Sequence, residues 1–100
     1  MSYTVEFETG LLDRLPREEH PKYKETISNK IIEHLEHRFY RIKPVRNHLQ
    51  KGIYEMKISL GGKGHRVAFS LRNNQIFVFY ISTNLQKVAF DKEVKKKIAK

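Results

Sequence analysis

Lys57 and Arg66 are the residues whose types and positions most directly suggest chemistry in this sequence. Each is a single cation within a segment of sheet-forming apolar residues, "IYEMKI" at 53–58 and "HRVAF" at 65–69. An arginine side chain matches two oxygens of one phosphate, whereas lysine is a compact charge that can also exchange a proton. The pair is therefore suited to holding a phosphate group while negative charge builds up on it.

Cleavage of RNA through its own 2′-hydroxyl needs such cations and requires neither a metal nor a protein nucleophile. A base must take the hydroxyl proton, cations must hold the phosphate, and an acid must protonate the leaving oxygen. We expect Lys57 and Arg66 to hold the phosphate, and Glu55, on the same strand face as Lys57, to be the base. The alternative is that both cations are ordinary exposed strand residues, with Lys57 paired to Glu55 or to a cross-strand partner.

The charge distribution favours a polyanionic partner. The chain has 20 Lys and Arg against 11 Asp and Glu, a formal net charge of +9. Between His37 and Phe90 there are ten basic residues and one acid. Such a bias attracts phosphate backbones, although a basic surface kept for solubility is the alternative. From this basic set we expect contacts to RNA from Arg46, Lys51, Lys63 and Arg72.

Other kinds of catalytic site find little support in the sequence. The absence of cysteine excludes disulfides and thiolate metal sites. His34 and His37 have a helical i, i+3 spacing, but no carboxylate–histidine signature accompanies them and a solvated helix face is the preferred interpretation. The stretch "GGKG" at 61–64 lacks the spacing of a phosphate-binding loop and a following helix. We therefore expect no metal and no cofactor.

The length of 100 residues indicates a single domain, 1–100, with a modest core and little room for an enclosed substrate chamber. The longest apolar run, Ile76 to Ile81, is far shorter than the roughly 20 residues of a membrane span. The first residues do not combine a cationic start with an apolar stretch. We expect a soluble, untargeted protein of the cytoplasm.

The elements that must position these cations begin with a strand at 3–8, "YTVEFE", where apolar and polar residues alternate. "LLDRL" allows a short helix before Pro16, and a second helix can start at Pro21. Residues spaced four apart give that helix one apolar stripe, formed by Tyr23, Ile27, Ile31, Leu35 and Phe39. We therefore expect two N-terminal helices packed on one face of a sheet.

Three further strands are expected at 53–60, 65–72 and 75–82, forming an antiparallel meander. Asn73 and Asn74 tolerate the positive φ of a two-residue hairpin turn, which places Arg66 opposite Ile81. In this register Val67, Phe69 and Leu71 share the core face with Ile76, Val78 and Tyr80. The lone cations then project from the face that the helices leave uncovered. The tail "DKEVKKKIAK" predicts a short basic C-terminal helix, and the whole is one α+β domain.

The order and spacing of four segments resemble the RelE/ParE superfamily of toxin–antitoxin toxins, RelE most closely. These segments are "YTVEF" as first strand, "IYEMKI" as the Tyr-x-x-Lys strand, "GHRVAF" as the Gly-x-Arg strand and "IFVFYIS" as the last strand. The resemblance covers nearly the whole chain. It implies a small antiparallel sheet with helices on one face, and a metal-independent endoribonuclease, an mRNA interferase that cuts messages in the ribosomal A site.

The resemblance assigns the catalytic lysine to Lys57 and the phosphate-holding arginine to Arg66. Glu55 stands where RelE has a second lysine. Near the C-terminus Gln86 or Lys87 takes the place of an arginine, so we expect Lys87 to restore the charge and Gln86 to contact RNA, while Phe90 takes the place of a tyrosine. These departures predict attenuated cleavage. The implied partners are the ribosome, mRNA and an acidic, partly disordered antitoxin.

Two other functions are compatible with the sequence. The superfamily includes ParE, whose members keep the fold, lack the nuclease residues and poison DNA gyrase. A toxin-derived binding module without catalytic activity is the other possibility. Lys57 and Arg66 favour the nuclease, whereas Gln86 and Phe90 favour these alternatives.

Overall fold

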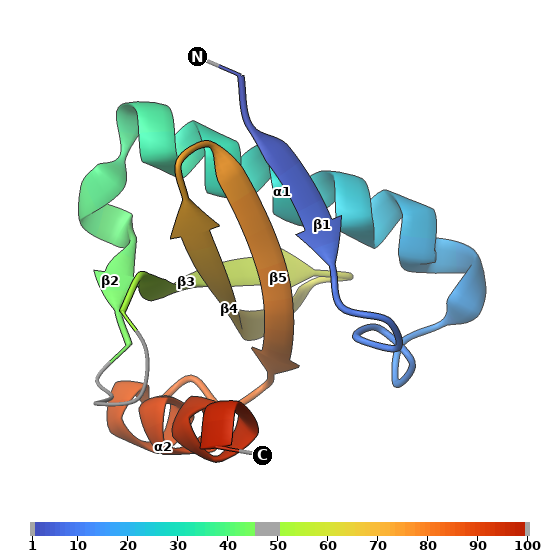
Figure 1. The fold of residues 1–100 in the computed structure, drawn as a ribbon. Coiled ribbons are helices and arrows are strands. Elements are labelled where there is room, and N and C mark those ends of the chain that lie inside the picture. The colour runs from blue at the N-terminus through green and yellow to red at the C-terminus, as the bar shows by residue number, and fades with distance from the viewer. Residues whose placement is uncertain (1, 46–50, 100) are drawn as a thin grey trace.

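The described part of the protein is a five-stranded sheet with a long helix on one face and a shorter helix across one end of the sheet (Figure 1). The structure is a computed structural model that describes residues 2–45 and 51–99. The sheet order is β1-β5-β4-β3-β2, with β1 parallel to β5 and the other pairs antiparallel. The strands are β1 (Thr4–Phe7), β2 (Lys43–Pro44), β3 (Ile53–Leu60), β4 (Lys63–Arg72) and β5 (Gln75–Ser82), and the helices are α1 (His20–His37) and α2 (Lys87–Ala99). The predicted α+β class and meander are confirmed.

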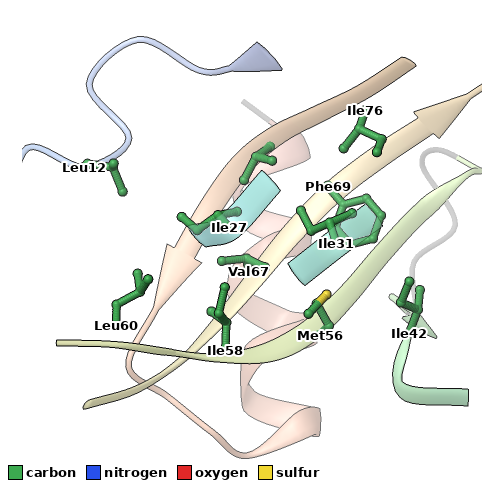
Figure 2. Packing of buried hydrophobic residues seen from close by; sticks show 11 residues of the cluster. Leu12, Ile27, Ile31, Ile42, Met56, Ile58, Leu60, Val67, Phe69 and Ile76 are labelled. Atoms are coloured by element: carbon green, nitrogen blue, oxygen red, sulfur yellow. The ribbon is translucent and has the colours of Figure 1, made fainter. Parts of the chain in front are cut away.

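Helix α1 packs its apolar stripe against one face of the sheet. Pro21 lies in its first turn, where a missing N–H costs no hydrogen bond. Ile27 and Ile31 are fully buried against residues of β3, β4 and β5, and Figure 2 shows them beside Val67 and Phe69. Phe39 does not join this stripe, because the chain leaves the helix at Arg38 and Phe39 lies in a short 3-10 turn, Phe39–Arg41, with 56% of its surface exposed.

The prediction of a short helix before Pro16 is wrong. Residues 9–14 form successive turns, and only the three residues Arg17–Glu19 form a 3-10 helix before α1. Gly10 has a φ of 81°, in the left-handed region that glycine favours and that ends regular structure. Pro16 then interrupts any helix that could continue from this segment. Leu12 still reaches the core, with 3% exposure, so the segment covers the sheet without being helical.

A β-bulge changes the predicted register of the β4–β5 hairpin. Asn73 adopts the expected positive φ of 57°, and Arg72 pairs with Gln75 as predicted. Between Ala68 and Phe69 the register shifts by one residue, so Arg66 lies opposite Ser82 instead of Ile81. Tyr80 consequently pairs with Ala68 and packs on the face opposite α1, which corrects its predicted place in the core.

Helix α2 covers part of the face that we expected to be free. Phe90 and Val94 on α2 are fully buried against Ala68 and Phe79 of the sheet, forming a second, smaller apolar cluster. In Figure 1 this helix lies across the end of the sheet where β5 finishes. A C-terminal helix was predicted, but its apolar residues Phe90 and Val94 bring it back onto the cationic face.

Acidification is expected to destabilise the fold through His34. This side chain lies on the buried side of α1, and its Nδ1 atom is buried without a hydrogen-bond partner. Burial lowers the pKa of His34 below its usual 6.5, opposed by Glu33 and assisted by the cations Arg41, Lys30 and Arg38. The unfolded chain therefore binds this proton more readily than the folded one.

The free energy of unfolding should have its full value above pH 6.5, the pKa of His34 in the unfolded chain. It should decrease as the pH drops toward the lower pKa of His34 in the folded protein. Urea midpoints at about pH 7 and about pH 5 measure the loss. In His34→Leu the decrease in urea midpoint between these two pH values should be smaller than in the parent. The exposed His37→Leu on the same helix is the control and should fall as the parent does. An identical fall in parent and His34→Leu would contradict this account.

Candidate functional site

Arg66 is the centre of the candidate site, and its guanidinium is buried. Lys57 and Arg66 are paired across β3 and β4, so their side chains leave the sheet on the same face, which Glu55 shares. Arg66 Nη1 donates to both carboxylate oxygens of Glu55, at 2.7 and 2.9 Å. Its Nε and Nη2 donate to the Leu85 carbonyl at 3.1 and 2.7 Å. The guanidinium thus joins β3 to the loop that leads into α2.

Lys87 connects the same carboxylate to helix α2. Its Nζ lies 3.1 Å from Glu55 Oε2 and donates to Asp91 Oδ1 and Oδ2 at 2.9 and 2.8 Å, one helical turn later. A further hydrogen bond runs from Nζ to the Pro44 carbonyl at 2.9 Å. All three N–H donors of the Lys87 ammonium group therefore have acceptors within the protein. Lys87 lies at the site, but its charge is already engaged by two carboxylates.

The four charged groups form one compensated network of two cations and two anions. The Glu55 side chain is 1% exposed, and those of Arg66 and Asp91 are 8% exposed. Buried charges are tolerated only when they are paired and hydrogen-bonded, as they are here. Both oxygens of Glu55 face cations, and the carboxylate has almost no contact with solvent. In this arrangement Glu55 is not placed to take a proton from a bound substrate.

Lys57 is the exposed cation of the site. Its side chain extends from the middle of β3, and among the described residues it forms no ion pair and no hydrogen bond. Gln86, in the loop before α2, is also exposed, and its backbone N–H donates to Asn84 Oδ1 at 3.2 Å. Phe90, expected near the substrate, is instead fully buried and packs its ring 5.8 Å from that of Tyr80. The surface open to a phosphate is therefore centred on Lys57.

The other predicted RNA-binding residues do not form a single group. Lys63 and Arg72 are both exposed, but they occupy opposite ends of the ten-residue strand β4, roughly 30 Å apart for an extended strand. Lys51, also exposed, precedes β3 near the Arg72 end, where the Leu71 N–H donates to the Gly52 carbonyl. Arg46 lies outside the described residues. Among the predicted residues that the structure describes, Glu55, Arg66 and Lys87 are in contact, and Lys57 lies beside them on the same face.

A neighbouring polar cluster was not predicted from the sequence. Tyr80 Oη donates to Glu93 Oε1 at 2.7 Å, and Asn84 Nδ2 donates to Glu93 Oε2 at 2.8 Å. Burial, then the bond to Glu93, raises the pKa of Tyr80 to about 12. Burial acts to raise the pKa of Glu93, but hydrogen bonds from Tyr80, Asn84 and Ser82 lower it overall. No spacing rule links these residues, because the bulge in β5 brings Tyr80 to this face.

Within residues 2–45 and 51–99, no group of three or more His, Asp or Glu side chains is arranged to hold a metal ion. Over the same residues, no helix has the length and apolar character needed to cross a bilayer.

The fold is similar to that of solved RelE toxins. A mutant of E. coli toxin RelE in the free state superposes with a TM-score of 0.57 at 20% identity, over 97% of this chain and 97% of that chain. The isolated E. coli RelE toxin gives 0.52 at 20% identity, covering 96% and 99%. The RelE mutant in complex with an antitoxin RelBc peptide gives 0.52 at 20% identity, covering 96% and 98%. The chain therefore has a RelE-like fold.

The sequence itself matches no protein-family model and no curated protein. The structural similarity thus concerns the fold.

Removing the Glu55 carboxylate is expected to destabilise the protein strongly. In Glu55→Gln, Arg66 and Lys87 lose the anion that compensates them, and an uncompensated buried charge costs about 3–5 kcal/mol. Denaturant unfolding measures the change. Glu6→Gln, an exposed carboxylate on β1, is the matched control and should shift stability by less than about 0.5 kcal/mol.

A double variant separates charge compensation from packing. Replacing both partners, as in Glu55→Leu with Arg66→Met, should recover much of the stability lost in Glu55→Gln, because no unpaired charge then remains between β3 and β4. A loss below about 1 kcal/mol in Glu55→Gln would show that the network contributes little and would contradict the assignment.

Proposed function

We propose that this protein is the toxin of a type II toxin–antitoxin module and a ribosome-dependent mRNA endonuclease that cuts through the RNA 2′-hydroxyl. The RelE-like fold supports the toxin assignment. The observation that carries the nuclease assignment is the exposed Lys57, whose side chain has no partner among the described residues and which lies directly across the β3–β4 ladder from Arg66. Such a cation on a strand is available to a phosphate without any loss of packing.

Lys57 has two tasks in the proposed reaction. The 2′-hydroxyl gives its proton to a solvent water as its oxygen attacks the adjacent phosphorus, the bond from phosphorus to the 5′-oxygen breaks, and a 2′,3′-cyclic phosphate and a 5′-hydroxyl result. The ammonium of Lys57 stabilises the charge that develops on the phosphate and donates a proton to the leaving 5′-oxygen. Arg66 can add a second positive charge only if its guanidinium turns away from Glu55 or Leu85.

Weak activity is part of the proposal. Glu55 neutralises Arg66 at 2.7 Å, where RelE, by resemblance, has a further cation. Lys87 does not restore the charge of the arginine expected near the C-terminus, since its ammonium contacts Glu55, Asp91 and the Pro44 carbonyl. Gln86 is exposed but uncharged, and Phe90 is buried. Glu55 could act as a base only after release from its two cations, so cleavage should be slower than in a relative with the full cation set.

The proposed partners are the ribosome with its mRNA and an acidic, partly disordered antitoxin, all in the cytoplasm. The net charge of +9 supports an acidic partner, because opposite charge accelerates association. A RelE mutant of the same fold was solved with an antitoxin RelBc peptide, which supports an antitoxin for this chain by analogy.

A toxin-derived binding module without catalysis is the second candidate. The observation that favours it is the Glu55–Arg66 pair, since a buried, fully engaged arginine has a structural role already. In that case Lys57 would be an ordinary exposed strand residue. Cleavage measurements distinguish the two candidates.

Lys57→Ala should reduce cleavage by about 100-fold, the usual effect of removing one acid–base or charge-stabilising group. Because Lys57 is exposed and has no partner among the described residues, the melting temperature should stay within a few degrees of the parent. Primer extension on messages bound to programmed ribosomes measures the rate. Lys92→Ala, an exposed lysine on α2, is the control and should cleave normally. Parental cleavage by Lys57→Ala would contradict the nuclease site.

Glu55→Gln should have the opposite effect on activity from its effect on stability. Loss of the carboxylate charge frees Arg66 to contact the phosphate, and one added electrostatic contact is worth roughly 10-fold in rate. The assay is run well below the melting temperature of the variant, with folding verified by circular dichroism. A folded Glu55→Gln that cleaves no faster than the parent would show that Arg66 takes no part in the reaction.

A further inference from the structure

An aromatic and cationic surface at the end of α1 is unused by the proposed reaction. Phe39 and Tyr40 follow the helix directly and are 56% and 72% exposed, although rings of this size are usually buried. Two large apolar side chains in succession on the surface indicate a binding role more than chance exposure does. Their segment connects α1 to β2 at the edge of the sheet (Figure 1).

Cations surround these two rings, and acids are scarce. Arg38, Arg41 and Lys43 are all exposed, and the sequence contains no acid from His37 to Tyr54. The Arg41 guanidinium lies 5.8 Å from the centroid of the Tyr40 ring. Arg38 Nε is 3.6 Å from Glu33 Oε1 of the preceding turn, an exposed pair of small energy that a stronger anion can replace. We call residues 38–43 the aromatic–cationic surface.

The backbone of this surface is held in place. The Arg38 N–H donates to the His34 carbonyl at 3.0 Å, the Arg41 N–H to the Arg38 carbonyl at 2.9 Å, and the Ile42 N–H to the Phe39 carbonyl at 3.0 Å. Ile42 is 5% exposed and belongs to the main core. The rings are therefore presented on a fixed turn, so little conformational entropy is lost when a ligand stacks on them.

The surface is continuous with the candidate site. Lys43 pairs with Glu55 across β2 and β3, so its side chain shares the face of Glu55 and Lys57. Lys57 is the diagonal neighbour of Lys43 in this ladder, at a typical separation of about 7 to 8 Å. A row of positive charge therefore runs from Lys57 over the sheet edge to Arg41 and Arg38.

We infer that the aromatic–cationic surface binds unpaired nucleotides of single-stranded RNA, with bases stacked on Phe39 and Tyr40 and phosphates held by Arg38, Arg41 and Lys43. Aromatic rings combined with arginines are the usual means of binding single strands without reading sequence. The choice of RNA as the ligand rests on the proposed function, because the nucleotides would be those next to the phosphate at Lys57. An acidic protein is the competing ligand for this surface, and it is an outcome of the test.

The test measures binding of a fluorescein-labelled, unstructured 12-nucleotide RNA to the purified protein by anisotropy, without ribosomes. Phe39→Leu and Tyr40→Leu keep an apolar side chain but remove the ring, and each should weaken binding roughly 10-fold. Tyr40→Trp should bind at least as tightly as the parent. Val88→Leu, at a 66% exposed apolar position on α2, is the matched control and should bind as the parent does.

The cations are tested through salt dependence. Replacing Arg38, Arg41 and Lys43 by glutamine should reduce the slope of log affinity against log salt by about 2, since each neutralised phosphate contributes about 0.7 for a single strand. Arg17→Gln, an exposed arginine before α1, should leave the slope unchanged. An RNA duplex of the same sequence should bind less tightly, and its affinity should not depend on Phe39 or Tyr40.

Parental RNA affinity in both leucine variants would overturn the inference. So would leucine variants that lose an acidic protein partner while keeping RNA, because the surface would then be a protein interface. The oligonucleotide assay contains no cleavage step. If the aromatic–cationic surface does not bind RNA, the effect of Lys57→Ala on ribosomes is still measurable. If the protein does not cleave mRNA, binding of the oligonucleotide is still measurable.

Discussion

The contact between Arg66 and Glu55 is the interaction on which the rest of the structure depends. It lies where β3, β4, the loop before α2 and the start of α2 converge, and each of these elements contributes a group. A buried guanidinium needs a carboxylate and further acceptors around it. The Glu55 carboxylate and the Leu85 carbonyl supply these, and Lys87 with Asp91 completes the charge balance.

This network gives the two faces of the sheet different characters. On the α1 face, the core around Ile27, Ile31 and Phe69 is mainly apolar. On the α2 face a smaller apolar cluster, centred on Phe90 and Ala68, lies beside the charged network. Helix α2 therefore depends on both burial and ion pairing for its position. A substitution that removes a charge at the site is therefore expected to weaken the packing of α2 against the sheet.

Stability and phosphate chemistry compete for the same side chain. Arg66 is the more suitable of the two cations for a phosphate, but its donors are already used, whereas Lys57 is exposed and unengaged among the described residues. Freeing Arg66 would leave the buried Glu55 carboxylate with Lys87 as its remaining cation among the described residues, with the energetic cost that this entails. On this face the exposed cations lie toward the sheet edge, from Lys57 through Lys43 to Arg41. We therefore expect a polyanion to bind along this edge and not at the buried Arg66.

The sequence by itself determined strands β1, β3, β4 and β5, the long helix and the placement of Lys57 and Arg66 on one face, because alternation of polar and apolar residues is a local property of each segment. It did not reveal the bulge at Ala68, the turns that replace the first helix, or the return of α2 onto the cationic face. Only the tertiary structure decided that Arg66 and Glu55 are buried together and that Lys57 is not. The physical reason is that burial of a charge depends on which distant segments cover it, and here Leu85, Lys87 and Asp91 come from a part of the chain about 20 residues away from Arg66.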